Sequence, residues 1–154
     1  MLIYLIRHGE AERPDPDKPK SLTQRGKVEV TRVAEALLQK GVKADALWHS
    51  PKKRAIQTAE IIQKAMGLPA KVLEEKEGLK PGGDADEVLR EILGERPRRL
   101  LIVSHLPFLP NLAALLLEGG KKSPSLLFPT AGVCAFEGDK TFKLLWNLSP
   151  GDLG

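Results

Sequence analysis

The sequence predicts an α/β fold in which helices cover both faces of one β-sheet. Short apolar runs of the kind found in buried strands alternate with segments whose apolar residues recur at helical spacing. Two more strand-like runs flank Gly138 and Asp139, which suit a tight turn, so the sheet is expected to close with a hairpin and to be mixed. The chain has 154 residues, which is the length of one domain, and we assign that domain to residues 1–154.

Six segments are predicted to be strands. Residues 2–6 and 100–104 are almost wholly apolar, as strands buried on both faces are. The other segments are shorter or carry polar residues on one side. The predicted strands are residues 2–6, 46–49, 71–73, 100–104, 132–136 and 141–146.

The first two helices are predicted from their ends. Thr23 is placed to open a helix that stops near Gly41, because glycine commonly ends helices. Ser50 is expected to cap the second helix, with Pro51 at its first position and Gly67 as its stop.

Two more helices are predicted in the second half of the chain. Asp84 with Glu87 three residues later has the spacing of a capping box, and the helix that it opens should run to about Glu95. Pro107 should begin the last helix, which is expected to reach about Glu118.

The chain is basic. Lysine and arginine number 24 against 20 aspartate and glutamate residues, which gives a net charge of +4 and favours anionic partners. The cations are spread along the sequence, and aromatic residues make up 5%, which leaves few rings for stacking bases. We therefore expect phosphate-bearing or acidic partners and no nucleic acid.

Apolar segments are short throughout. The first one stops at Arg7 and follows no basic segment, unlike a signal peptide. No run approaches the roughly 18 apolar residues that cross a bilayer, so we expect a soluble, cytoplasmic protein without membrane contact. Cys134 is the single cysteine, cannot form an intramolecular disulfide, and is predicted to be a buried strand thiol.

Histidines and arginines follow several predicted strands. Arg7 and His8 come after the first strand, Arg54 lies in the helix after the second, and His105 follows the strand at 100–104. Open α/β sheets bind ligands at the carboxyl ends of their strands. Two guanidinium groups can clamp a phosphoryl group, and a histidine among cations stays neutral and nucleophilic. The pattern predicts a site for phosphoryl transfer.

Neighbouring residues fit the same chemistry. Gly9 would let the backbone approach the ligand closely, and His105 could donate a hydrogen bond to a phosphoryl oxygen. Helix starts near Ser50 and Pro107 would add amide donors. His49 lies within its strand and is assigned to packing or to the surface.

A metal site is the main competing interpretation, because histidine with a carboxylate can bind zinc. Arg7 directly precedes His8, however, and a cation beside the site repels a metal ion. No two histidines have the short spacing of ligands on one helix. We predict catalysis without a metal ion or other cofactor.

The strand-end residues belong to longer motifs. These are Arg7-His8-Gly9-Glu10, Leu22-Thr23 with Gly26, the run at residues 50–58, Pro81-Gly82-Gly83-Asp84, Ser104-His105-Leu106-Pro107 and Leu148-Ser149-Pro150. In this combination, over nearly the whole chain, the sequence resembles the histidine phosphatase superfamily, and most of all its short SixA branch of phosphohistidine phosphatases.

The resemblance implies a three-layer α/β/α sandwich with a mixed, mostly parallel central sheet. It implies that His8 is the nucleophile and forms a phosphohistidine intermediate, which water then hydrolyses. Arg7, Arg54 and His105 would form the phosphate pocket, with Gly9 beside it. No metal ion is implied.

A general acid is the weakest part of the pattern. Larger members of the superfamily protonate the leaving oxygen with a carboxylic acid, and the candidates here are Glu75, Glu77 and Asp84. The alternative, which we favour, is that these are solvated loop charges and, at Asp84, a helix cap.

The missing acid bears on the substrate. Imidazole can leave a phosphohistidine already protonated, whereas an alkoxide needs a proton from the enzyme. Few residues besides the proline-rich loop at 11–21 could form a lid, so an open pocket for a protein-borne phosphate is expected. A small-molecule phosphomonoesterase and a non-catalytic phosphate-binding adaptor are the alternatives, and the oligomeric state stays open.

Overall fold

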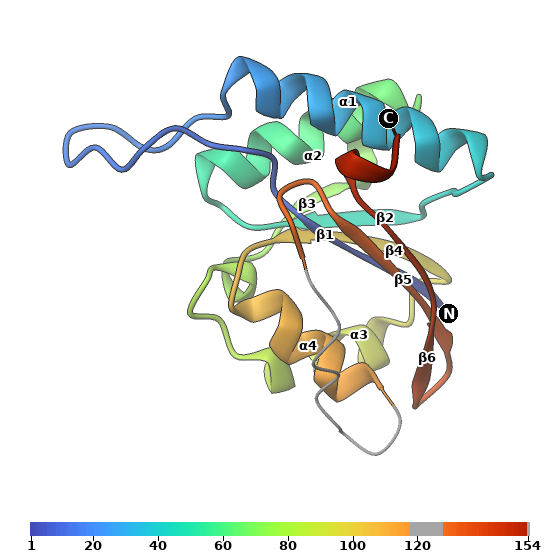
Figure 1. Cartoon of the computed structure of the whole chain (residues 1–154). Coiled ribbons are helices and arrows are strands. Elements are labelled where there is room, and N and C mark those ends of the chain that lie inside the picture. The colour runs from blue at the N-terminus through green and yellow to red at the C-terminus, as the bar shows by residue number, and fades with distance from the viewer. Residues whose placement is uncertain (118–127, 154) are drawn as a thin grey trace.

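The computed structural model describes residues 1–117 and 128–153, in which six strands form one sheet in the order β3-β2-β4-β1-β5-β6. Helices α1 and α2 lie on one face of this sheet, and α3 and α4 lie on the other (Figure 1). The predicted α/β/α layers are confirmed. The strands are β1 (Leu2–Arg7), β2 (Ala46–His49), β3 (Leu73–Glu75), β4 (Arg99–Ser104), β5 (Val133–Gly138) and β6 (Phe142–Leu148).

The sheet is mixed and mostly parallel, as expected. Strands β3, β2, β4 and β1 run parallel to one another, and the hairpin of β5 and β6 adds antiparallel strands beside β1. The strand β4 therefore returns between β2 and β1. The α-helices are α1 (Gln24–Gln39), α2 (Lys53–Ala65), α3 (Ala85–Glu95) and α4 (Phe108–Leu116).

Side chains of β1 alternate between two apolar clusters, because successive strand residues point to opposite faces of a sheet. Ile3 and Leu5 pack with α3 and α4, whereas Tyr4 and Ile6 pack with α1 and α2. Burial on both faces explains why this strand is apolar throughout and why its first polar residues come at its carboxyl end.

Several predicted helix ends are confirmed. Thr23 caps α1 by accepting a hydrogen bond from the amide of Gly26, and Asp84 caps α3. Gly41 and Gly67 follow α1 and α2 with φ angles of +80° and +68°, which glycine adopts without strain. None of the helices in the two described ranges is long and apolar enough to cross a membrane.

The predicted start of α2 is wrong. The helix begins at Lys53 with Lys52 at the cap position, instead of being capped by Ser50 with Pro51 inside it. The physical reason is that the Ser50 side chain is fully buried and its Oγ lies 2.7 Å from Nε2 of His105. The hydroxyl contacts the residue that follows β4, and Pro51 and Lys52 form a bend before the helix.

Other predicted boundaries differ by one or two residues; helix α4, for example, begins at Phe108 with Pro107 at the cap position. Residues Ala70–Val72 form a short 3-10 helix, and β3 starts at Leu73, which pairs with Leu47 of β2. The predicted strand at 71–73 was therefore placed two residues too early. Helix α4 is described to Leu116, and the predicted end at Glu118 lies outside the described residues.

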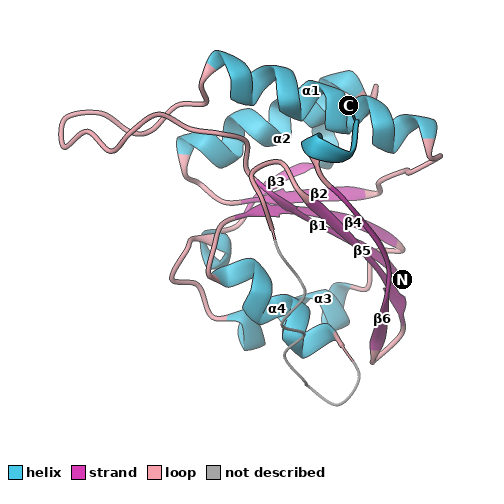
Figure 2. Cartoon of the chain, viewed as in Figure 1, coloured by secondary structure: helices cyan, strands magenta, loops and turns pink. Residues whose placement is uncertain are grey.

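Residues 11–21, which we call the arm, project away from the body of the molecule beyond the end of β1 (Figure 2). Its two sides pair at Ala11 with Leu22 and at Asp15 with Lys18, like a small hairpin. The arm does not fold over the sheet (Figure 2).

Candidate active site

The catalytic residues predicted from the motifs lie at the ends of adjacent strands. Arg7 at the end of β1 pairs in register with Ser104 at the end of β4, so His8 and His105 follow side by side. The amide of His8 donates to the carbonyl of Ser104 at 3.1 Å, and the two imidazole ring centres are 5.0 Å apart.

The chain leaves the sheet in opposite directions after β1 and after β4, which are adjacent strands. After β1 the chain crosses to α1 on one face, and after β4 it crosses to α4 on the other face. Such a switch point is where open α/β sheets bind their ligands. A cavity of about 330 Å³ lies there, lined by Arg7, His8, Glu10, Ala11, Glu12, Lys20, Arg54, His105, Leu106 and Thr130.

The ring of His8 is fixed in one tautomer. Its Nδ1 lies 2.7 Å from the carbonyl oxygen of Gly9, and since a carbonyl only accepts, Nδ1 carries the proton and donates it. Nε2 then has a free lone pair. Burial lowers the pKa of His8 to about 4, opposed by the Gly9 hydrogen bond and assisted by the charges of Arg54, Arg7 and Lys20. At neutral pH this side chain is an uncharged nucleophile.

His105 is held differently. Its Nε2 lies 2.7 Å from Oγ of Ser50, and its buried Nδ1 has no hydrogen-bond partner among the described residues. Ser50 Oγ accepts the amide of Lys52 at 3.1 Å, and its own proton is available for Nε2 of His105; when the hydroxyl donates there, the imidazole proton lies on Nδ1. Burial, followed by the effects of His8 and Arg54, lowers the pKa of His105 to about 3. His105 is therefore a neutral donor with one unused N–H.

The two arginines supply positive charge without a carboxylate partner in the described ranges. Arg7 Nη1 donates to the carbonyl of Phe128 at 3.0 Å, while its buried Nε has no partner among the described residues. Burial lowers the pKa of both Arg7 and Arg54, but a guanidinium stays charged near neutral pH. Half-buried charge of this kind favours an anion in the cavity.

The structure corrects the reason for a glycine at position 9. A Cβ there would lie 2.6 Å from Cγ2 of Val30, so the glycine allows α1 to pack against the loop. The amide of Gly9 donates to Oγ1 of Thr58 at 3.0 Å, and Gly9 does not line the cavity. Thr58 Oγ1 in turn donates to the carbonyl of Arg54 at 2.7 Å. Thr58 thus ties the nucleophile's loop to the helix that carries Arg54.

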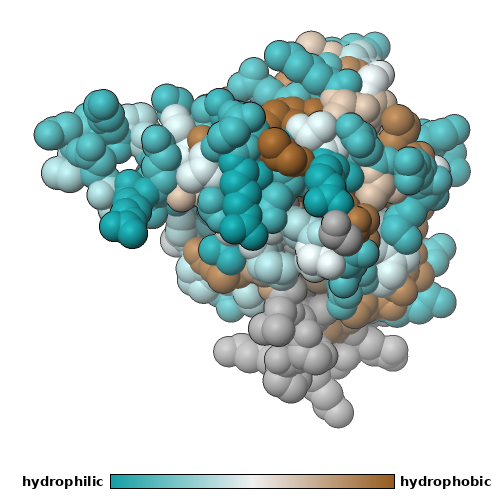
Figure 3. Space-filling model, turned by 45° about the horizontal axis from the view of Figure 1, so that its top comes forward, coloured by the Kyte–Doolittle hydropathy of each residue, from teal (hydrophilic) through white to brown (hydrophobic). Residues whose placement is uncertain are grey.

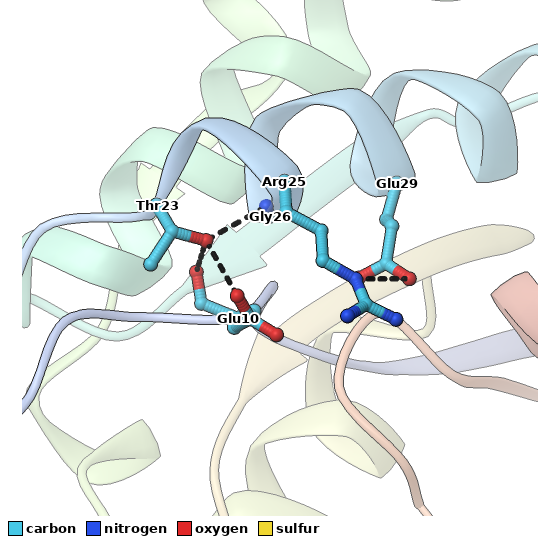
Figure 4. A network of polar contacts seen from close by, with 5 residues as sticks. All are labelled: Glu10, Thr23, Arg25, Gly26 and Glu29. Atoms are coloured by element: carbon cyan, nitrogen blue, oxygen red, sulfur yellow. Dashed lines mark hydrogen bonds and ion pairs between the residues drawn. The ribbon is translucent and has the colours of Figure 1, made fainter.

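A second set of contacts holds the residues after His8 (Figure 4). Oγ1 of Thr23 donates to the Glu10 carboxylate at 2.9 Å and accepts the amide of Gly26 at 2.9 Å. A side chain at Gly26 would overlap the backbone of Glu10. Thr23 and Gly26 of the motif therefore hold the start of α1 against the loop that follows His8.

The three candidates for a general acid lie away from the cavity. Asp84 accepts the amides of Asp86 and Glu87 as the cap of α3, and Glu77 forms an ion pair with Lys80. The favoured alternative of a helix cap at Asp84 is confirmed.

Sheet order explains why these acids are remote. Glu75 ends β3 and is exposed, and β2 and β4 separate β3 from β1. Among the described lining residues the carboxylates are instead Glu10 and Glu12. Neither glutamate was predicted as a site residue from the sequence, nor was Lys20, although Glu10 directly follows the Arg-His-Gly motif.

Two residues set aside from the sequence are indeed buried in the fold. His49 is 7% exposed, and its Nδ1 donates to the carbonyl of Ser50 at 3.0 Å. Cys134 is buried in β5, and burial raises the pKa of its thiol to about 11. In the described part of the chain, no three histidine, cysteine or acidic side chains are grouped as metal ligands.

An uncharged buried histidine beside two arginines, at the switch point of an α/β/α sheet, defines an anion-binding site suited to phosphoryl groups. Comparison with known proteins agrees. The chain belongs to the histidine phosphatase superfamily (branch 1), whose sequence profile matches residues 3–80.

Full-length relatives place the chain with the SixA type. It is 32% identical to the phosphohistidine phosphatase SixA of Escherichia coli (strain K12), over 99% of this chain and 96% of that protein. It superposes with a TM-score of 0.90, at 27% identity and over 100% of both chains, on the protein histidine phosphatase SixA complexed with tungstate. The α-ribazole phosphatase of Shigella flexneri shares the fold, with a TM-score of 0.74, 20% identity and 97% of each chain covered.

Proposed function

We propose that this protein is a phosphohistidine phosphatase that removes the phosphoryl group from histidine in proteins through a covalent intermediate on His8. One observation carries the proposal. The Nδ1 proton of His8 is held on the carbonyl of Gly9, so Nε2 offers its lone pair to a cavity lined by Arg7, Arg54 and His105.

The first step is phosphoryl transfer to the enzyme. Nε2 of His8 attacks phosphorus, the bond from phosphorus to the substrate nitrogen breaks, and the electron pair of that bond goes to the leaving imidazole. Arg7 and Arg54 bind the phosphoryl oxygens, and the Nδ1–H of His105 is positioned to donate to another. All three interactions strengthen as charge spreads over those oxygens in the transition state.

The second step is hydrolysis. The intermediate keeps the Nδ1 proton of His8 on the Gly9 carbonyl, so its ring is protonated and leaves as neutral imidazole. Water attacks phosphorus, the bond from phosphorus to Nε2 breaks, and the protons of the water depart with the product as dihydrogen phosphate. His8 returns to its starting tautomer without a metal ion or an outside reductant or oxidant.

The same logic favours histidine as the substrate's phosphate carrier. An imidazole protonated on its second nitrogen leaves as a neutral molecule, so cleavage needs no acid from the enzyme. A serine alkoxide needs one, and the predicted acids Glu75, Glu77 and Asp84 lie outside the cavity. The two carboxylates that line it are already used in the loop, since Glu10 accepts Oγ1 of Thr23 and Glu12 accepts the amide of Ser21. The arm also projects away from the body of the molecule (Figure 2), which suits a phosphate displayed on a protein surface.

The proposal is tested by phosphate release from a phosphohistidine peptide, a phosphoserine peptide and p-nitrophenyl phosphate, all with a chelator present. We expect the phosphohistidine peptide to have the highest kcat/KM, the aryl ester to follow and phosphoserine to be slowest. Quenching with an alkaline denaturant during turnover should trap phosphate on His8 in an acid-labile, base-stable form. A clear preference for the aryl ester would move the substrate class to small phosphomonoesters.

A further inference from the structure

The arm lies beside the cavity but extends far beyond it. Glu12 and Lys20, at its base, line the cavity, whereas residues 12–19 are all exposed. Asp15, near the tip, is four residues beyond Ala11, which amounts to about 13 Å of extended chain at about 3.3 Å per residue. A small phosphate ester held at His8 cannot span that distance, so only a macromolecular substrate reaches the tip.

The arm has a defined shape of its own. The amide of Asp17 donates to Oδ1 of Asp15 at 2.8 Å, and the amide of Glu12 donates to the carbonyl of Ser21 at 2.8 Å. Prolines restrict the backbone at positions 14, 16 and 19. These features lower the conformational entropy that the arm loses when it binds a partner, so the arm is suited to docking.

The charges on the arm are not equivalent. Of its three carboxylates, Asp15 and Glu12 accept backbone amides within the arm, whereas Asp17 makes no such contact. Its cations Arg13, Lys18 and Lys20 have no ion-pair partner anywhere in residues 1–117 and 128–153. The arm is hydrophilic over the surface visible at the left of Figure 3. The side chains of the arm that are left without a partner among the described residues are therefore mostly cations.

The start of α2 carries the same charge. Lys52 and Lys53 are exposed and, within the described residues, unpaired. The charge of Lys52 lowers the pKa of His105, and that of Lys20 lowers the pKa of His8. Lysines from two different segments therefore lie near the two rings. Five cations, Arg13, Lys18, Lys20, Lys52 and Lys53, together form what we call the basic rim.

We propose that the basic rim docks an acidic surface on the protein that carries the phosphohistidine, and that the arm is the main contact outside the cavity. The proposal rests on the proposed function, and it adds the kind of partner and the segment that binds it. Charge complementarity of this type selects partners and speeds their association, and it weakens as salt is added.

The experiment compares two phosphohistidine peptides of equal length, one with glutamate and aspartate around the histidine and one with glutamine and asparagine. The test variant is Arg13→Glu with Lys18→Glu. The matched control is Lys43→Glu with Lys140→Glu, which changes the net charge equally at exposed positions near the amino ends of the parallel strands. The readouts are kcat and KM for each peptide and for p-nitrophenyl phosphate, at low and high salt.

We expect wild type to have a KM for the acidic peptide about 5- to 10-fold below that for the neutral peptide, a gap that narrows at high salt. The arm variant should lose this gap, the control should keep it, and both should hydrolyse p-nitrophenyl phosphate like wild type. Equal KM values for the two peptides in wild type, or an equal loss in both variants, would overturn the docking proposal.

Binding separates this proposal from the proposed function. Fluorescence anisotropy with the His8→Ala protein gives the Kd for each labelled peptide without turnover. If wild type leaves phosphohistidine uncleaved but the acidic peptide binds more tightly through the arm, the docking surface stands and the proposed function fails. If wild type cleaves both peptides alike and Kd is insensitive to the arm variant, the proposed function stands and the docking surface fails.

Discussion

His8 and His105 sit at the ends of neighbouring strands and are similarly buried, at 8% and 2% exposure, yet different kinds of group hold their rings. A main-chain carbonyl, that of Gly9, fixes the tautomer of His8. A side chain that follows another strand, that of Ser50, contacts the ring of His105 instead. The nucleophile's tautomer therefore depends on the backbone alone, whereas the donor's tautomer depends on one hydroxyl that a substitution can remove.

The largest effect should come from the nucleophile. His8→Ala removes the atom that accepts the phosphoryl group, so we expect kcat for the phosphohistidine peptide to fall by about 10⁴-fold or more. Circular dichroism should show an intact fold, because this side chain borders the cavity and belongs to neither apolar cluster. Phosphate bound covalently to this variant during turnover would contradict the assignment of His8.

His105→Ala should have a smaller effect, because it removes a donor to the phosphoryl oxygens and leaves the nucleophile in place. We expect kcat to fall by about 10²- to 10³-fold, as for loss of one oxyanion donor. The acid-labile phosphohistidine should still form in a rapid-quench experiment, only more slowly. Loss of the intermediate altogether would show that the two rings share the nucleophilic role.

Acid should destabilise the fold through both rings. Their folded-state pKa values, about 4 for His8 and about 3 for His105, lie below the ordinary value near 6.5, so the unfolded chain binds more protons below pH 6.5. Stability is thus complete above pH 6.5 and decreases as pH falls towards 4. At about 1.4 kcal/mol per pH unit for each ring, the free energy of unfolding should drop by about 2 to 3 kcal/mol between pH 7 and 5.5.

Urea unfolding at these two pH values measures that loss. The His8→Asn/His105→Asn protein has neither titrating ring and should lose clearly less stability over the same range. An equal loss in wild type and in the double variant would assign the acid sensitivity to other groups.

The smallest effect distinguishes the two kinds of support. Ser50→Ala removes the hydroxyl that donates to Nε2 of His105, so the imidazole proton can move to Nε2 and the donor at Nδ1 is lost. We expect kcat to fall by about 10-fold, and the nitrogen chemical shifts of His105 to report the change of tautomer while those of His8 stay constant.

Ser104→Ala is the matched control for this prediction. Ser104 is equally buried and immediately precedes His105, but its hydroxyl donates to the carbonyl of Leu79 at 2.6 Å. Both variants lose a buried hydrogen bond, and only Ser50→Ala should change the tautomer of His105. Similar spectra for the two variants would reduce Ser50 to a packing role.

The sequence predicted the elements well where a local signal exists. Thr23 and Asp84 cap helices as expected, and the apolar run that ends at Arg7 is a strand. The prediction failed at Ser50, because its side chain contacts His105, which is distant in sequence, instead of capping the helix. Helix-capping propensity depends on neighbouring residues only, so it does not account for a hydrogen-bond partner 55 positions away.

Arg7, His8, Arg54 and His105 were predicted as site residues from their positions after strands, and the structure brings them to one cavity. Their order around that cavity could not be predicted, because the sequence does not say that β4 returns between β2 and β1. The strand order also places Glu75 away from the site, because its strand β3 lies at the edge of the sheet.

The sequence by itself determined the alternation of strands and helices and the residue types that bind phosphate, because both are encoded in short stretches of chain. Tertiary structure alone decided which strands are neighbours, which ring nitrogen of each histidine carries its proton, and the roles of Thr58 and Lys20 beside them. These features depend on contacts between residues far apart in the chain, which form only when the apolar faces of the sheet are covered by their helices.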